Sequence, residues 1–367
     1  MPNIILVGSW MWPWYQEACA RALRELGCRV DRFSWLDDFY QWVPGHVEPV
    51  YKSSWARLQN RFLVGPALMA INKRLLKTAV TLDHDVIWFY NCTHIFPGTI
   101  RQLRRLLPQT VLVQYVNDNP FGAHVKPDYW RYLKRSIPEF DVHFIFRRSN
   151  EPEFLKAGAR SVHLLRPYYL PWEDCRVDLQ SGDERYLSDV VFAGHYEPDG
   201  RMESLEAIAA AGYHLKLFGG GWMKYVQLSS TSPLRSQLPI EPVVGDDYRK
   251  AISGAKIALC FLSKINRDTC TRRNFEIPAM QTFMLGEYTD DLAALFAEGV
   301  EAEFFRSREE MLEKIKYYLC HNAKREQIAC NGYHRVQRDG QDVFSRMKQF
   351  LAVVSYAIES KRTRACR

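Results

Sequence analysis

The chain has 367 residues, of which 47% are hydrophobic and 25% charged, and its formal net charge is +7. This composition is typical of a folded soluble protein. The length exceeds what a single hydrophobic core usually organises, so we expect two domains.

Membrane-spanning and secreted classes are disfavoured by the sequence. No apolar run approaches the roughly 20 residues that a bilayer-spanning helix needs, and the N-terminus lacks the basic start of a signal peptide. The nine cysteines are scattered without a Cys-x-x-Cys pair. This favours reduced thiols over a disulfide framework or a structural zinc site. We expect a cytoplasmic protein, with the inner membrane face as its second location.

The positive charge is concentrated in the first half of the chain. Residues 1–165 contain 21 Lys and Arg against 14 Asp and Glu, which accounts for the whole excess. An anionic membrane surface or a polyanionic substrate would be attracted there, and an ordinary solvated surface is the alternative. The aromatic loop 10–15 suits core packing or a lid, and equally a membrane interface or a sugar-stacking surface. A nucleic-acid-binding protein is the weaker reading, because no RRM, KH or helix-turn-helix pattern occurs.

The first half alternates apolar strands with helices. The expected strands are 3–8, 29–33, 85–90, 110–116, 142–146 and 161–165, and the expected helices are 15–26, 55–79, 97–107 and 151–157. This spacing predicts a parallel, doubly wound sheet.

Polar residues just beyond the strand ends are candidates for a ligand site, because ligands bind there in such sheets. They are Gly8, Ser9, His94, Asn117 and Asp118. We take Asp118 and His94 as candidates for the catalytic base or acceptor-orienting group. A structural histidine and simple turn chemistry are the alternatives.

A segment rich in Pro, acidic and aromatic residues, 166–188, looks like an interdomain linker, and a second alternation follows it. The expected strands are 189–193, 214–218, 257–262 and 282–286, and the expected helices are 201–211, 248–253, one from 290, 307–321, 323–336 and 343–361. Gly194, His195 and Gly219 follow two of these strands, and glycine permits close backbone approach to a ligand. No G-x-G-x-x-G fingerprint supports a dinucleotide site.

A polar loop and a helix start between residues 266 and 276 carry the clearest chemical signal. Thr271 is the expected helix cap, and Arg272 and Arg273 lie in the first turn. Basic side chains do not suit the positive end of a helix dipole unless an anion lies there. The arrangement therefore predicts a phosphate or diphosphate site.

The run R-x-F-E-I-P-A at 273–279, followed by an apolar strand, an Asp-rich turn and Leu-Phe, resembles the C-terminal half of CgeB-like, family-4-like glycosyltransferases of the GT-B fold. The resemblance implies two Rossmann-like domains, 1–170 and 186–340, facing each other across a cleft. It also implies that the last helix, within 341–367, packs back on the first domain.

The resemblance also implies roles for individual residues. Glu276 matches the glutamate that holds the ribose hydroxyls of the nucleotide sugar. Asp268 stands eight positions earlier, where many relatives carry a second glutamate. Arg201 and Arg273 are the diphosphate candidates, with Arg272 as the substitute for Arg273.

The implied activity is transfer of a hexose-like sugar from a UDP-, GDP- or dTDP-sugar to a glycan, lipid-linked or protein acceptor, with retention of configuration and no metal ion. It would serve polysaccharide biosynthesis in a bacterium. The only D-x-D triplet, Asp83 to Asp85, precedes a strand instead of following one. The alternatives are a non-catalytic scaffold or coat protein of the same fold, a sugar-nucleotide epimerase and a nucleic-acid-binding protein.

Overall fold

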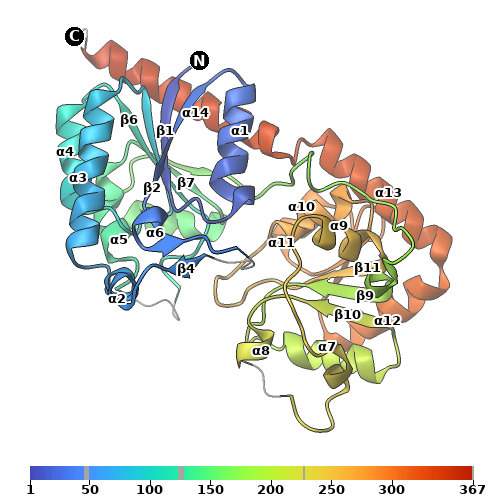
Figure 1. Cartoon of the computed structure of the whole chain (residues 1–367). Helices are drawn as coiled ribbons and strands as arrows, with labels where there is room; N and C mark the ends of the chain where they lie inside the picture. Colours follow the sequence, from blue (N-terminus) through green and yellow to red (C-terminus); the bar gives the residue numbers. More distant parts are fainter. Residues whose placement is uncertain (45–48, 123–127, 226–227, 366–367) are drawn as a thin grey trace. The chain divides into compact units, whose positions relative to one another are not determined.

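The computed structural model describes residues 1–44, 49–122, 128–225 and 228–365. The chain divides into two compact units (Figure 1), one made of Met1–Arg166 with Val343–Arg367 and the other of Pro167–Asp342. Below they are called unit 1 and unit 2. The boundaries between the two units lie after residues 166 and 342. The sequence analysis predicted that the two domains end at residues 170 and 340.

Unit 1 is built on a six-stranded parallel sheet. In order across the sheet, the strands are β2 (Arg29–Ser34), β1 (Asn3–Gly8), β5 (Val86–Tyr90), β6 (Val111–Val116), β7 (Val142–Ile145) and β8 (Val162–Leu164). A separate two-stranded hairpin consists of β3 (Tyr40–Gln41) and β4 (Val50–Tyr51). The parallel, doubly wound prediction is confirmed for this unit.

The helices of unit 1 are α1 (Ala18–Glu25), α2 (Ser54–Phe62), α3 (Pro66–Thr81), α4 (Pro97–Leu106), α5 (Arg131–Ser136), α6 (Glu151–Lys156) and α14 (Val343–Ala365). Alternate strand residues face opposite sides of the sheet. Phe89 of β5 packs with Leu75 of α3 and Leu103 of α4. Its neighbour Trp88 faces the other side, where its ring centroid lies 4.2 Å from that of Phe350 on α14. The sheet is therefore covered on both faces, as parallel sheets require.

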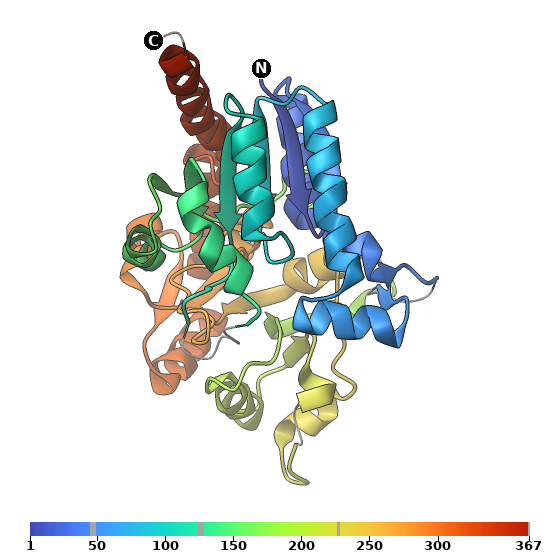
Figure 2. The ribbon, with the colours of Figure 1, turned by 90° about the vertical axis from the view of Figure 1, so that its left-hand side faces the viewer.

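The last helix belongs to unit 1, as the fold resemblance implied. α14 runs along the sheet of unit 1 (Figures 1 and 2) and packs against α1 and β6. Lys361 near its end forms a 2.7 Å ion pair with Asp141. Within the described residues, no helix is long and apolar enough to cross a bilayer.

The predicted helical region 55–79 is helical, and it consists of two helices, α2 and α3, with a sharp turn between them. Leu63 has a positive φ of 50°, and Gly65 has a φ of 108°. A left-handed residue ends a helix, and Pro66 then starts α3 at a position where its fixed φ is favourable. The Gly-Pro pair was the sequence signal for this break.

The aromatic loop 10–15 is packed inward. Trp10 is only 8% exposed, and its indole N–H donates a 3.0 Å hydrogen bond to the carbonyl of Phe33. Trp12 and Trp14 are half-buried and stack on each other, with ring centroids 5.0 Å apart. These contacts support core packing among the alternatives for this loop.

Unit 2 has a five-stranded parallel sheet. Its strands, in order across the sheet, are β10 (Leu215–Phe218), β9 (Ser188–Ala193), β11 (Ala255–Cys260), β12 (Phe283–Glu287) and β13 (Glu303–Phe305). Its helices are α7 (Arg201–Ala210), α8 (Trp222–Tyr225), α9 (Asp246–Ser253), α10 (Arg273–Ala279), α11 (Asp290–Leu295), α12 (Arg308–Cys320) and α13 (Asn322–Arg338).

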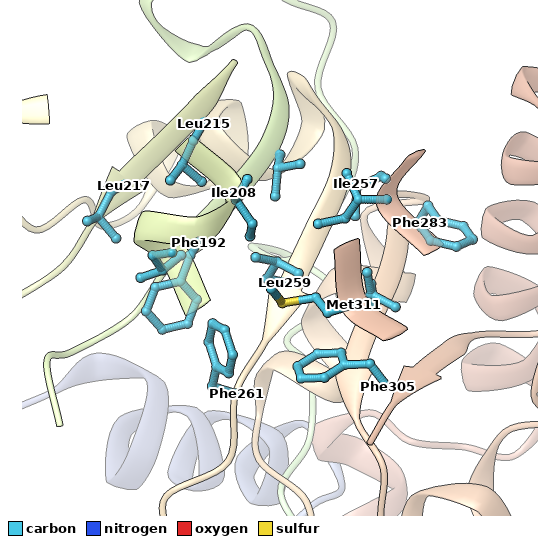
Figure 3. Close-up of a cluster of buried hydrophobic side chains, with 14 of the residues drawn as sticks. Phe192, Ile208, Leu215, Leu217, Ile257, Leu259, Phe261, Phe283, Phe305 and Met311 are labelled. Carbon is cyan, nitrogen blue, oxygen red and sulfur yellow. The ribbon is translucent and has the colours of Figure 1, made fainter. Parts of the chain in front are cut away.

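The core of unit 2 lies on both faces of this sheet. On one face Phe192 packs with Ile208 of α7 and Met311 of α12 (Figure 3). On the other face Ala258 packs with Phe275 of α10. Burial of α10 on this second face fixes the direction in which the polar side chains of its first turn point.

The predicted linker is part of unit 2. Asp174 in this segment is 3% exposed, and Val177 donates its backbone N–H to the hydroxyl of Ser253 at 3.2 Å. Arg176 donates to the carbonyl of Gln281. These contacts hold the segment against the elements that carry the candidate site.

Candidate functional site

The carboxyl ends of the strands of unit 2 meet at one edge of the sheet, and Glu276 lies there in the first turn of α10. The residue is 7% exposed. The Tyr248 hydroxyl on α9 donates a 2.8 Å hydrogen bond to Glu276 Oε2, and Arg272 Nε donates to Oε1 at 2.5 Å. A carboxylate can accept about four hydrogen bonds, so these contacts leave capacity for the hydroxyls of a ligand.

A second carboxyl group, on Asp174, lies on the far side of Arg272. The Arg272 guanidinium is 3.4 Å from Asp174 Oδ2, which also accepts a 2.6 Å hydrogen bond from the backbone of Leu170. Burial raises the pKa of Asp174 to about 8; the negative charge of Glu276 adds to the rise, and Arg272 opposes it. Arg272 therefore pairs directly with Glu276, and burial together with the Glu276 charge favours the protonated form of Asp174.

Arg273, the first residue of α10, is bonded to the protein through only one end of its guanidinium group. Its Nε donates a 2.5 Å hydrogen bond to the carbonyl of Ala193 at the end of β9. Within the described part of the chain, its two terminal nitrogens have no protein partner. Burial and the charge of Glu276 raise the pKa of the Tyr248 hydroxyl, and the charge of Arg273 lowers it, so the three groups lie within electrostatic reach of one another.

Arg201 is committed to protein groups. It is 5% exposed, and it donates to both carboxylate oxygens of Asp199, at 2.8 Å from Nε and 2.6 Å from Nη2. A further hydrogen bond goes to the carbonyl of His195, and Glu197 lies 3.6 Å away. Because Asp199 neutralises its charge, the arrangement favours a structural role over the predicted diphosphate contact.

The prediction that Thr271 caps α10 is wrong. Arg272 is the residue that precedes the helix, and no side chain caps it. Instead the side-chain oxygen of Asn274 accepts a 2.8 Å hydrogen bond from the backbone N–H of Thr271. Asp268 lies half-buried in the same loop, where its backbone N–H donates to the carbonyl of Ser263 at 2.9 Å.

Two neighbouring strand ends approach closely at Gly194 and Gly219. A Cβ atom on Gly219 would lie 1.9 Å from the carbonyl oxygen of Gly194, and the φ of Gly219 is 149°. The indole of Trp222 donates a 2.9 Å hydrogen bond to that same oxygen. Backbone packing alone thus requires Gly219, whereas His195 beside it has an exposed side chain.

The equivalent edge of unit 1 carries Gly8 and Ser9 at the end of β1. A Cβ atom on Gly8 would lie 2.8 Å from Gln16 Cγ, so the glycine is needed for packing. The carbonyl of Ser9 accepts a 3.2 Å hydrogen bond from the Ser34 hydroxyl. The contacts of Gly8 and Ser9 are explained by packing within unit 1 and do not indicate a bound ligand.

Asp118 follows β6 at the same edge. Asn91, which follows β5, donates a 3.2 Å hydrogen bond to Asp118 Oδ2. Burial raises the pKa of Asp118, and the charge of Arg147 together with this hydrogen bond opposes the rise. A carboxyl group with a raised pKa at a strand end is the kind of group that general acid–base chemistry uses.

His94 lies in a buried aromatic pocket. Its Nε2 is 2.7 Å from Asn60 Oδ1 and its Nδ1 is 2.8 Å from the Thr93 hydroxyl, and its ring stacks on Trp35. Burial lowers the pKa of His94 to about 3. Since both ring nitrogens are occupied, these contacts favour the structural alternative.

Sequence reasoning missed Tyr248 and Asp174 as members of the site. They lie 28 positions from Glu276 and 98 positions from Arg272, respectively. The only local signal for Tyr248 was its place in the predicted helix 248–253. Asp174 had none, because its segment looked like a linker.

A separate cavity of about 640 Å³ lies at the opposite edge of the sheet of unit 2. Its lining includes Ser188, Ala255 and Phe283, where three strands begin, and it excludes Glu276. In parallel sheets the ligand site is found at the carboxyl ends of the strands. We therefore assign the candidate site to Glu276 and its neighbours.

The chain is similar to known proteins in part of its sequence and in its fold. Residues 201–352 match the family model described as glycosyl transferase-like. No curated protein sequence is significantly similar to the chain.

Solved structures resemble the whole chain. HepE from Anabaena, in complex with UDP and glucose, has a TM-score of 0.67 at 13% identity, covering 97% of this chain and 100% of HepE. Sucrose-phosphate synthase from Thermosynechococcus elongatus has a TM-score of 0.67 at 12% identity, covering 98% and 100%. A glycosyltransferase from Rickettsia africae has a TM-score of 0.66 at 10% identity, covering 97% and 98%. The chain thus has the GT-B fold, and its residues 201–352 are similar to the glycosyl transferase-like family.

Proposed function

We propose that this protein is a glycosyltransferase that moves a hexose-like sugar from a UDP-sugar to a hydroxyl group of a glycan, lipid-linked or protein acceptor. The observation that carries the proposal is the pairing of Glu276 with Tyr248 and Arg272, directly beside the open guanidinium end of Arg273. HepE binds UDP and glucose in its solved structure, and this supports a UDP-sugar as the donor over a GDP-sugar or a dTDP-sugar.

The donor roles follow from charge and hydrogen-bonding capacity. Glu276 accepts hydrogen bonds from the two ribose hydroxyls, because its carboxylate is fixed by Tyr248 and Arg272 and still has free acceptor capacity. Arg273 binds the diphosphate through its terminal nitrogens. Asp268, eight residues before Glu276, is proposed to contact the sugar.

The leaving group is stabilised by protein groups in this proposal. The acceptor oxygen forms a bond to the anomeric carbon while the bond from that carbon to the diphosphate oxygen breaks, with retention of configuration. Negative charge then develops on the diphosphate, where Arg273 and backbone N–H groups stabilise it without a metal ion. The acceptor proton passes to the departing phosphate.

Asp118 is the proposed acceptor-side residue of unit 1. Its carboxyl group, held by Asn91, is proposed to accept a hydrogen bond from the acceptor hydroxyl and to orient it. We place the reaction in bacterial polysaccharide biosynthesis, in the cytoplasm at the inner membrane face.

A thermal-shift comparison of UDP, GDP, dTDP and CDP, with EDTA and again with Mn²⁺, tests the donor proposal. UDP alone should raise the melting temperature, and EDTA should leave the shift unchanged. A strict Mn²⁺ requirement would remove the metal-independent mechanism. No shift with any nucleotide would favour the non-catalytic scaffold, and UDP-sugar isomerisation without an acceptor would favour the epimerase.

A further inference from the structure

Helix α2 of unit 1 presents an apolar face to solvent. Trp55, Leu58 and Phe62 are 61%, 47% and 55% exposed. Their spacing of three and four residues places them on one side of the helix. The adjoining side of the helix is buried and carries Ala56 and the polar Gln59, so these three large apolar side chains lie outside the buried face.

The apolar face continues past the end of α2. Val64 in the turn and Met69 in the first turns of α3 are 51% and 67% exposed. We call these five residues, Trp55, Leu58, Phe62, Val64 and Met69, the α2 surface. Single exposed apolar residues are ordinary, but a run of five on consecutive elements marks an interaction surface.

The scaffold beneath the α2 surface is fixed by hydrogen bonds, so the exposure is built in. The Ser53 hydroxyl caps the helix by accepting from the Ala56 N–H at 3.0 Å. Asn60 donates to the hydroxyls of Tyr40 and Tyr51 at 3.2 and 3.0 Å. The polar side chains of α2 are thus used to attach the helix, which leaves the apolar ones outside.

Positive charge surrounds the α2 surface. The 34 residues from Pro49 to Leu82 contain six Lys and Arg and no Asp or Glu. Arg57 and Arg61 are exposed beside the apolar face, and the Arg61 guanidinium lies 5.6 Å from the centre of the Phe62 ring. Cationic side chains close to an anionic bilayer strengthen its attraction for the protein.

We propose that the α2 surface docks the protein on the anionic surface of a phospholipid bilayer. Trp and Phe insert at the headgroup level, Leu and Met follow, and Arg57 and Arg61 bind lipid phosphates. The charge complementarity selects an anionic lipid surface as the occupant, and the convex helix face needs no matching groove. With nine residues, α2 lies in the interface and does not cross it.

This docking is independent of the glycosyl-transfer proposal, since no residue of the α2 surface belongs to the donor site. Co-sedimentation with vesicles of phosphatidylcholine, with and without phosphatidylglycerol, tests it directly. Wild-type protein should pellet with the anionic vesicles and be released by salt.

Two double variants separate the apolar from the electrostatic contribution. W55S/F62S should weaken binding to anionic vesicles by roughly tenfold or more, because inserting one aromatic ring into the bilayer already raises the affinity by more than about tenfold. R57Q/R61Q should weaken binding to anionic vesicles and leave binding to neutral vesicles unchanged. Tyr356→Ser on α14, also in unit 1 and 74% exposed, is the matched control and should bind like wild type.

Other occupants give different results. Wild-type protein that stays in the supernatant with anionic vesicles overturns the proposal, as does W55S/F62S that pellets like wild type. Dimerisation that W55S/F62S abolishes, seen by sedimentation velocity without lipid, would assign the surface to a second copy of the chain and also overturn it. Cooperative thermal unfolding of each variant, followed by circular dichroism, confirms that it is folded.

Discussion

The hydroxyl of Tyr248 donates a 2.8 Å hydrogen bond to Oε2 of Glu276, and this bond joins α9 to α10 at the carboxyl edge of the unit 2 sheet. The raised pKa of the Tyr248 hydroxyl, caused by burial and by the Glu276 charge, keeps it protonated and therefore a donor. Together with Arg272 it holds the carboxylate in one orientation before any ligand binds. Such preorganisation reduces the entropy lost on binding.

Replacing Glu276 with Ala should weaken UDP binding by about 1–3 kcal/mol, because the ribose hydroxyls lose their acceptor and Tyr248 loses its partner. Isothermal titration calorimetry with UDP measures the change. Glu313→Ala, an exposed glutamate on α12, is the control and should leave the affinity unchanged. Wild-type affinity in the Glu276 variant would remove this residue from the site.

Tyr248→Phe should have a smaller effect than Glu276→Ala, about 0.5–1.5 kcal/mol, because the carboxylate keeps Arg272 and loses only one donor. The double variant should not add the two losses, since both act on the same carboxylate. Additive losses in that cycle would show that Tyr248 contacts UDP independently of Glu276.

Replacing Arg273 should affect ligand binding, whereas replacing Arg201 should affect the stability of the fold. Arg273→Gln removes the open guanidinium end and should weaken binding of UDP while leaving binding of uridine, which lacks phosphates, unchanged. Arg201→Gln breaks the buried pair with Asp199 and should lower the free energy of unfolding by roughly 3–5 kcal/mol. Urea unfolding and UDP titration on both variants check this. The opposite pattern would restore Arg201 as the diphosphate ligand.

The sequence predicts the strands of both sheets except β13, because apolar runs bounded by turn residues are a local signal and the three residues of β13 are too short a run to give one. It also locates Glu276, which lies in a motif that resembles known transferases. The partners of Glu276 could not be found this way, since Tyr248 and Asp174 reach it only after the sheet brings α9 and the segment after residue 166 together. The prediction of a Thr271 cap is wrong because the side-chain oxygen of Asn274 accepts the backbone N–H of Thr271 in this turn.

Asp174 should make stability depend on pH. An unfolded aspartate ionises near 3.8, while the pKa of Asp174 in the fold is about 8. Between these values the folded state holds a proton that the unfolded state lacks. The contribution of Asp174 to stability is therefore fully present below the lower value and is lost as the pH rises through the higher one.

The variant Asp174→Asn cannot ionise, and its amide oxygen can still accept from Leu170. Its free energy of unfolding, measured by urea from about pH 5 to about pH 9, should decline less with pH than that of the wild type. Asp178→Asn, an exposed neighbour, should follow the wild type. Parallel curves for wild type and Asp174→Asn would contradict the raised pKa.

Asp118 and His94 should behave differently when replaced. Asp118→Asn keeps the shape of the side chain and should lower kcat by about 10- to 100-fold, because the acceptor hydroxyl loses the charged carboxylate that orients it. His94→Ala leaves Asn60 and Thr93 without their partner and should lower the free energy of unfolding by roughly 1–3 kcal/mol. Its kcat, per folded molecule, should stay close to that of the wild type.

The pH dependence of unfolding gives a second readout for His94. Its pKa in the fold is about 3, against 6.5 for the free side chain. Below the higher value the unfolded chain binds a proton that the folded protein excludes, so stability falls as the pH drops from 6.5 toward 3. His94→Ala should lack this part of the fall. A His94 variant that unfolds like the wild type but loses kcat would instead make His94 catalytic, because only a group that meets the substrate could act without supporting the fold.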